Sequence, residues 1–198
     1  MNKGRVEAFT DAVVAIILTI MILEFKTPES LQFSAVYENL PYFASYVVGY
    51  IFVGVAWYNH HYMFSVSKRI TKKVYWMNNF WLFSTSFLPV ATAWVGRGLN
   101  AFGPEAFYTI VYVIWTISYI LLSRSLIQAN HLAHADEAAE KIKSMPMYRG
   151  LTNWWYIVGL VILDVLALRF FPALQLVFMA GSVIFVGARS NADSDKLF

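Results

Sequence analysis

The chain has 198 residues, of which 59% are hydrophobic and only 14% are charged. A soluble domain carries roughly 25% charged residues, so this composition excludes an ordinary soluble protein and predicts a surface that largely faces lipid. The absence of cysteine excludes disulfides, thiolate metal sites and a cysteine nucleophile. The net charge is +3, and the basic residues cluster in short loops. They form no continuous basic stripe, so no nucleic-acid partner is expected.

Six stretches are apolar enough to cross a membrane core about 30 Å thick, which takes roughly 20 residues of helix. They are residues 7–26, 38–64, 74–96, 105–129, 150–170 and 172–189. We therefore predict an all-α polytopic membrane protein with six transmembrane helices, forming a single domain over residues 1–189. The polar stretch 129–143 is expected to continue the fourth helix, and residues 190–198 are expected to form a polar, disordered tail.

Lysines and arginines indicate the orientation, because positively charged loops stay on the cytoplasmic side of a membrane. If both termini are cytoplasmic, 12 of the 15 basic residues lie inside. The 3 outside are Lys26, Arg97 and Arg169. The sequence thus predicts a multi-pass protein of the cell membrane, in contact with the lipid bilayer, with both termini in the cytoplasm.

The first predicted helix contains the run "RVEAFTDAVVAIILTIMIL" over residues 5–23. Positions three, four and seven apart share one helix face. One stripe therefore contains Arg5, Phe9, Ala12, Ile16, Thr19, Ile20 and Leu23. Periodicity alone favours a packing face, with Thr19 bonded to a carbonyl of its own helix, over a pore lining. Asp11 points away from the stripe. An unpaired charge at membrane depth costs at least ~2.5 kcal/mol, so Asp11 is expected to turn into the protein and meet polar groups of other helices, in its own subunit or in a neighbour.

The run "RVEAFTD" resembles the Arg-x-x-x-Phe-Ser-Asp signature of the transmembrane protein 175 family, the potassium channels of bacteria and of animal endolysosomes. Thr10 stands where the family usually has serine. The resemblance continues through "AVVAIILTIMILEF", "WYNHHYMF" and "KKVYWMNNFWLFSTSFLPVATAWVG", so recognisable motifs cover residues 5–96. It implies a homotetramer of six-helix subunits in which four first helices line a central pore.

Carried over by position, the resemblance implies that Ile16, Thr19 and Leu23 form the pore constriction. Ala12 and Ile20 would also line the pore. The resemblance further implies a network that anchors the base of the first helix, with the members Arg5, Phe9, Thr10, Asp11, Trp57, His60, His61 and Asn78. Within it, one histidine is expected to meet Asp11 or Arg5, together with Asn59, Trp57 or Asn78.

The sequence has no "TVGYG" loop, so a filter of stacked backbone carbonyls is not available. Rings of Ile16 and Leu23 would gate by dewetting, and Thr19 hydroxyls would help to dehydrate potassium more readily than sodium. Glu24 would form an outer acidic ring, or else a solvated helix end paired with Lys26. Protons, caesium and rubidium are further candidate permeant ions.

No metal site and no cofactor other than the permeant ion are expected. His60 and His61 are adjacent, so they point about 100° apart and cannot share one metal. Ligand-like spacing occurs after the fourth span, at His131, His134, Asp136 and Glu137. This group lacks a cysteine or a second pair, as a zinc site would need. Asp164, inside the fifth span, is expected to hydrogen-bond to a tyrosine, asparagine or serine of a neighbouring helix.

Three classes of function compete for this sequence. An enzyme lacks a site, because there is no serine elbow, glycine-rich phosphate loop or pair of intramembrane aspartates. A secondary transporter would show inverted repeats or broken helices, whereas the first helix has no Gly or Pro between residues 5 and 27. We therefore predict a passive potassium-selective channel and not an enzyme. A proton-coupled or cation secondary transporter is the alternative, and a membrane-embedded enzyme is a weaker one.

Overall fold

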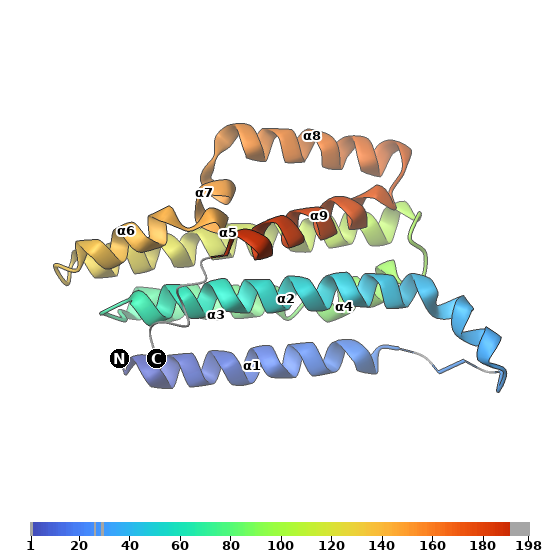
Figure 1. Ribbon diagram of the computed structural model, residues 1–198, viewed down its shortest axis with the longest axis horizontal. Helices are drawn as coiled ribbons and strands as arrows, with labels where there is room; N and C mark the ends of the chain where they lie inside the picture. The colour runs from blue at the N-terminus through green and yellow to red at the C-terminus, as the bar shows by residue number, and fades with distance from the viewer. Residues whose placement is uncertain (1, 26, 29, 191–198) are drawn as a thin grey trace.

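Figure 1 shows the computed structural model as layers of helices whose axes run in nearly the same direction. It describes residues 2–25, 27–28 and 30–190. The elements are α1 (Lys3–Leu23), η1 (Phe33–Asn39), α2 (Leu40–Val66), α3 (Lys72–Thr85), α4 (Leu88–Val95), α5 (Phe102–His131), α6 (Asp136–Ser144), α7 (Pro146–Thr152), α8 (Trp154–Phe170) and α9 (Leu174–Arg189). α1 forms one outer layer and α8 the opposite one, with the remaining helices between them.

The helices differ in how well each could cross a membrane alone. Within the described residues, α1, α2 together with η1, and α5 are long and apolar enough. α7 and α8 meet the same requirement only as a pair bent by 73°. α9 has 16 residues, which is about 24 Å of helix. The prediction of an all-helical protein with several apolar helices is confirmed, whereas six crossings stay a prediction.

The third predicted span, residues 74–96, is broken between α3 and α4. Pro89 lies in the first turn of α4. Proline has no N–H, and its ring clashes with the carbonyl four residues earlier, so one straight helix cannot run through this point. The Phe87 amide bonds instead to the Ser84 carbonyl at 3.3 Å, three residues back, in a tighter turn. α4 then continues beyond the end of α3 (Figure 1).

The prediction that the fourth helix continues through residues 129–143 is wrong. α5 ends at His131, and His134 adopts a φ of 53°, in the left-handed region. The chain then reverses, and α6 lies against α5 (Figure 1). The apolar side chains of α6 are buried, namely Ala138, Ala139 and Ile142. A straight extension would have left this apolar face in water, so the fold-back is the more stable arrangement.

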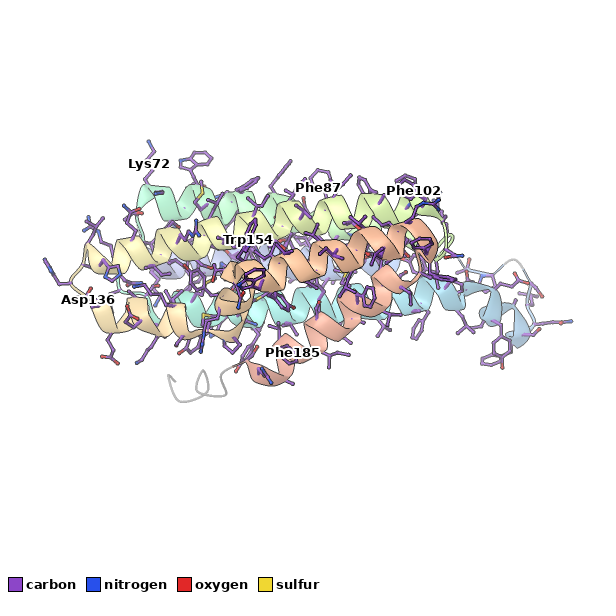
Figure 2. The ribbon with its side chains drawn as sticks, turned by 90° about the horizontal axis from the view of Figure 1, so that it is seen from above. Lys72, Phe87, Phe102, Asp136, Trp154 and Phe185 are labelled. Carbon is purple, nitrogen blue, oxygen red and sulfur yellow. The ribbon has the colours of Figure 1, made fainter. Side chains whose placement is uncertain are left out.

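The core lies among α2, α3, α4 and α5 and contains large aromatic side chains. Trp81, Trp115 and Tyr119 are fully buried. Aromatic side chains also project outward along the length of the bundle, including Phe87 and Phe102 in the view of Figure 2. Exposed rings of this kind suit contact with lipid or with neighbouring subunits.

Segments predicted to be cytoplasmic gather at one end of the bundle. The start of α1, the α2–α3 connection and the α5–α6 turn lie at this end, and the α4–α5 and α8–α9 connections lie toward the other (Figure 1). Figure 2 shows Lys72 and Asp136 near one end and Phe102 near the opposite one. Lys26, Lys196 and the predicted tail beyond Ser190 lie outside the described residues.

Candidate functional site: the first helix and its anchors

α1 has two contrasting faces. Its packed face consists of buried residues three or four positions apart, namely Val6, Thr10, Val14, Ile17 and Met21. The stripe predicted from sequence is exposed at every position, at Arg5, Phe9, Ala12, Ile16, Thr19, Ile20 and Leu23. Ile16 is 56% exposed and Leu23 is 78% exposed. A continuous row of large apolar side chains on an outer helix indicates a surface for lipid or for another subunit.

The Thr19 hydroxyl has a defined hydrogen-bonding role within this exposed stripe. Its Oγ1 donates to the carbonyl of Ile16 at 2.9 Å. A hydroxyl has one hydrogen and two lone pairs, so a bond that uses the hydrogen leaves the oxygen able only to accept. Thr19 therefore presents an exposed acceptor oxygen between two apolar residues of the stripe, as a cation ligand requires.

The base of α1 is attached to the end of α2. Lys3 Nζ donates to the carbonyl of Ser65 at 2.9 Å and to the carbonyl of Ser67 at 3.2 Å. The last carbonyls of a helix lack partners within the helix and carry partial negative charge. The Lys3 ammonium group supplies the missing hydrogen-bond donors and a positive charge. It thereby joins the two helices at this end.

A buried chain of hydrogen bonds joins α1, α3 and α2 about two turns further along α1, at Thr10. Asn78 Nδ2 donates to Thr10 Oγ1 at 2.8 Å, and Thr10 Oγ1 donates to the Val6 carbonyl at 2.9 Å. Asn78 Oδ1 lies 2.7 Å from His60 Nε2. Because an amide oxygen can only accept, this assignment of the amide places the imidazole proton on Nε2. Thr10, Asn78 and His60 are all buried, so the bonds form away from water.

Aromatic rings hold the His60 imidazole in place. It stacks against Phe64 at 4.3 Å and against Trp81 at 4.7 Å between ring centroids. His60 therefore bonds to Asn78, one of the expected partners, and a contact between a histidine and Asp11 or Arg5 stays a prediction. This pairing depends on how α2 and α3 are rotated about their axes and how close they lie, and a sequence motif shows neither.

Asp11 makes a second link between α1 and α2, at the edge of the interface. Trp57 Nε1 donates to Asp11 Oδ1 at 2.8 Å, and the His61 ring stacks on Trp57 at 5.6 Å. Asp11 is exposed in the single chain, and the bond from Trp57 confirms the prediction that it meets a polar group of another helix. Among the described residues, no hydrogen bond or ion pair reaches the exposed side chain of Arg5. Arg5 and Phe9 are both exposed in the single chain, and their place in the anchor network stays a prediction.

The sequence did not single out the anchor at the far end of α1. Tyr42 donates its hydroxyl to the carbonyl of Met21 at 2.7 Å, and the Phe25 ring packs edge-on against it at 5.4 Å. A tyrosine near a helix start is expected at any membrane interface, so no sequence signal marks this one. Glu24 is exposed at the C-cap of α1, and its predicted pairing with Lys26 lies outside the described residues.

The remaining candidate residues lie away from α1. His131 Nδ1 lies 2.5 Å from Asp136 Oδ1. Glu137 lies 2.8 Å from Lys141, whose hydrogen bond and charge lower the pKa of the Glu137 carboxyl. No three His, Asp or Glu side chains form a metal-like group in the described part of the chain. Asp164 lines a narrow space between α5, α8 and α9, and the other residues there include Tyr112, Gln175 and Ser182.

Known proteins resemble this chain in sequence and in fold. A family profile described as the endosomal/lysosomal potassium channel TMEM175 matches residues 5–89. A potassium channel of Chryseobacterium sp. (strain P1-3) is 41% identical over 128 residues, which cover 65% of this chain and 67% of that protein. A potassium channel of Streptomyces collinus is 32% identical over 141 residues, 67% of this chain and 68% of that protein.

A solved structure matches over almost the whole chain. It is the crystal structure of a lysosomal potassium-selective channel TMEM175 homolog from Chamaesiphon minutus, with a TM-score of 0.74. The match covers 96% of this chain and 98% of that chain at 24% sequence identity. The two chains therefore share a fold, including the segments beyond residue 89.

Proposed function

The chain belongs to the TMEM175 family, a family of ion channels and not of enzymes, and from this premise we propose that it is a potassium-selective channel of the cell membrane. Four copies assemble around a central pore, and each contributes α1. The exposed stripe of α1 carries this proposal. α1 is tied to its own subunit on one face, while its opposite face keeps large apolar side chains exposed.

The constriction lies in the second half of α1. Rings of Ile16 and Leu23 form a narrow apolar neck from which water and ions withdraw. Thr19 lies between them. Its hydroxyl donates its hydrogen to the Ile16 carbonyl, and the oxygen coordinates the ion through a lone pair. Ala12 and Ile20 line the same pore, and the exposed Glu24 provides an acidic ring that raises the local cation concentration at the outer mouth.

The subunit crosses the membrane six times in this proposal. α1, α2, α3 with α4, α5, α7 with α8, and α9 form the six crossings. Both termini are cytoplasmic in this proposal, as are the start of α1 and the α2–α3 connection at one end of the bundle (Figure 1). The concentration of lysine and arginine in these segments supports this orientation.

Potassium flux into proteoliposomes tests the proposal. We expect passive flux down a potassium gradient, with potassium preferred over sodium. Thr19→Val removes the ligand oxygen and keeps the branched shape, whereas Thr19→Ser keeps the hydroxyl. A contact between a hydroxyl and a charge contributes roughly 1.5 kcal/mol, so we expect Thr19→Val to lower the potassium-to-sodium permeability ratio about tenfold and Thr19→Ser to retain it.

A matched control and two contrary outcomes complete this test. Thr109→Val is the control, because the Thr109 hydroxyl bonds to the Glu105 carbonyl at 2.9 Å within α5, away from the pore stripe. Unchanged selectivity in Thr19→Val would exclude the threonine ring. Stoichiometric coupling of potassium flux to protons or to another solute would replace the channel with a secondary transporter.

A further inference from the structure

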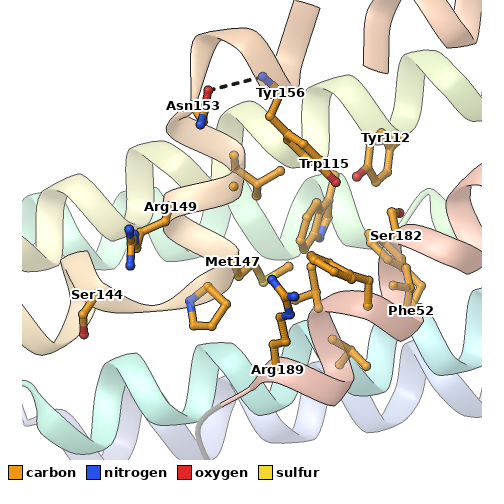
Figure 3. A pocket seen from close by; sticks show the side chains of 17 residues that line it. Phe52, Tyr112, Trp115, Ser144, Met147, Arg149, Asn153, Tyr156, Ser182 and Arg189 are labelled. Carbon is orange, nitrogen blue, oxygen red and sulfur yellow. Dashed lines mark hydrogen bonds between the residues drawn. The ribbon is translucent and has the colours of Figure 1, made fainter. Parts of the chain in front are cut away.

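A cavity of about 490 Å³ lies among α2, α5, α7, α8 and α9, in a different part of the subunit from the exposed stripe of α1. Figure 3 shows Phe52, Tyr112 and Trp115 on its walls, with Arg149 on the left and Arg189 below them. This volume is within the range of sites that bind a small molecule or a large part of a lipid. The anchors and the pore residues of α1 do not use it.

The bend between α7 and α8 opens this cavity. Asn153 Oδ1 accepts the amides of Trp155 at 3.0 Å and Tyr156 at 3.3 Å, so it caps a new helix at this point. The axes of α7 and α8 differ by 73°, and α8 runs apart from the rest of the bundle (Figure 1). Ala167 is the one buried residue of α8, all of which the structure describes. The cavity therefore lies where α7 meets the first turn of α8, which contributes Tyr156 to its lining.

The residues around the cavity combine an apolar wall with positive charge. Arg149 lies in the last turn of α7 and Arg189 ends α9, and both are exposed. The residues that line the cavity include no Asp or Glu. Among the described residues, neither guanidinium has a carboxylate within 4 Å, and Arg189 lies over the Phe185 ring at 4.1 Å. Two positive charges without a partner anion thus lie beside an apolar space.

Trp115 forms part of the inner wall of the cavity. Its side chain is fully buried, and its Nε1 atom has almost no accessible surface, so the residue contributes apolar wall and not a donor within reach of an occupant. An occupant that fits must carry negative charge at one end and an apolar body.

We propose that the cavity binds one anionic phospholipid. Its phosphate lies between Arg149 and Arg189, because planar guanidinium groups bind phosphate oxygens through paired hydrogen bonds. Its acyl chain covers the apolar wall. Basic pockets between membrane helices recognise lipid headgroups by this combination of charge and apolar surface. A free phosphate would satisfy the arginines and leave the apolar wall uncovered.

Two substitutions separate the charged and the apolar parts of this site. The double variant Arg149→Gln with Arg189→Gln removes both charges and keeps the cavity. Gly150→Leu keeps both charges and places a side chain into the lining, where an added Cβ would have Tyr156 as its nearest neighbour at 3.9 Å. The control is Arg169→Gln in the last turn of α8, because Arg169 is also exposed and lies 5.4 Å from the Phe170 ring.

The measurement is lipid affinity of the purified full chain in detergent, titrated with phosphatidylglycerol, phosphatidylcholine or inorganic phosphate. We expect phosphatidylglycerol to bind at least about tenfold more tightly than phosphatidylcholine. Both the double arginine variant and Gly150→Leu should lose at least about tenfold in affinity, and Arg169→Gln should bind as the wild type does. Equal binding of the two lipids, or wild-type affinity in Gly150→Leu, would overturn the proposal. Inorganic phosphate that binds as tightly as the lipid would replace it with a simple anion site.

Discussion

The bundle of α1 to α5 and the pair formed by α8 and α9 are packed in different ways. In the first region, buried polar side chains such as Thr10, His60 and Asn78 join three helices through hydrogen bonds. In α8 the buried set is Ala167 alone, among residues that are all described. The family profile matches residues 5–89, which lie in the first region. The arrangement of α1 thus depends on specific polar bonds, whereas the α8–α9 side has room for a cavity.

Glycines show the same difference. A Cβ on Gly96 would lie 2.7 Å from Tyr42 Cα, a backbone atom that cannot move aside. A Cβ on Gly159 in α8 or on Gly181 in α9 would meet nothing within 4 Å. The three positions therefore allow the packing of the two regions to be compared by one chemical change.

Gly96→Ala should have the largest effect. The added methyl group must push α2 and α4 apart, and overpacking of this kind costs about 3 kcal/mol of the free energy of unfolding. Thermal unfolding of the detergent-solubilised protein, followed by tryptophan fluorescence, measures it. Gly54→Ala in α2 is the control, because a Cβ at Gly54 would meet nothing within 4 Å. Equal stability of the two variants would contradict the close contact at Gly96.

Asn78→Ala should have the next largest effect, a loss of about 2 kcal/mol in the free energy of unfolding. It leaves His60 Nε2 and Thr10 Oγ1 buried without their partner. Asn79→Ala is the matched control, because Asn79 Nδ2 bonds to the Tyr75 carbonyl within its own helix at 2.8 Å. The comparison uses the same unfolding assay. If both variants lost the same stability, the network between helices would not hold α1 in the way we describe.

Gly159→Ala and Gly181→Ala should have the smallest effect, and in the opposite direction. Alanine is the better helix former by up to about 1 kcal/mol, and the open space at both sites imposes no steric cost. We expect the free energy of unfolding to rise by about 0.5 kcal/mol or to stay unchanged. A marked loss of stability in either variant would show that another subunit packs against this region.

The stripe of α1 could be predicted because helix phase is a local property. The grouping of Ile16, Thr19 and Leu23 on one face needed nothing beyond their spacing, and all three are exposed together in the structure. Their role in the pore stays a prediction. The pairing of Asn78 with His60 could not be derived, because it depends on how α2 and α3 are rotated about their own axes.

The break between α3 and α4 and the fold-back of α6 could not be predicted from hydropathy. Hydropathy runs unbroken across Pro89, and the polar run after α5 hides the amphipathic pattern of α6. The turn at His134 needs a left-handed residue, and no glycine marks it. The cavity was invisible in the sequence because Phe52, Trp115 and Arg189 come from distant segments. In the sequence, Arg149 and Arg189 are two of the 12 basic residues that indicate the orientation.

The anchors of α1 restrict how a pore built from it could open. Bonds at Lys3, at Thr10 and Asp11, and at Met21 fix the helix to its own subunit at three heights. α1 also has no proline, and its one glycine, Gly4, lies at its first turn, so the helix has no internal hinge beside Ile16. In the proposed channel, the opening and closing steps would therefore be rotamer changes of Ile16 and Leu23, or rigid displacement of whole subunits, and not a swing of the helix alone.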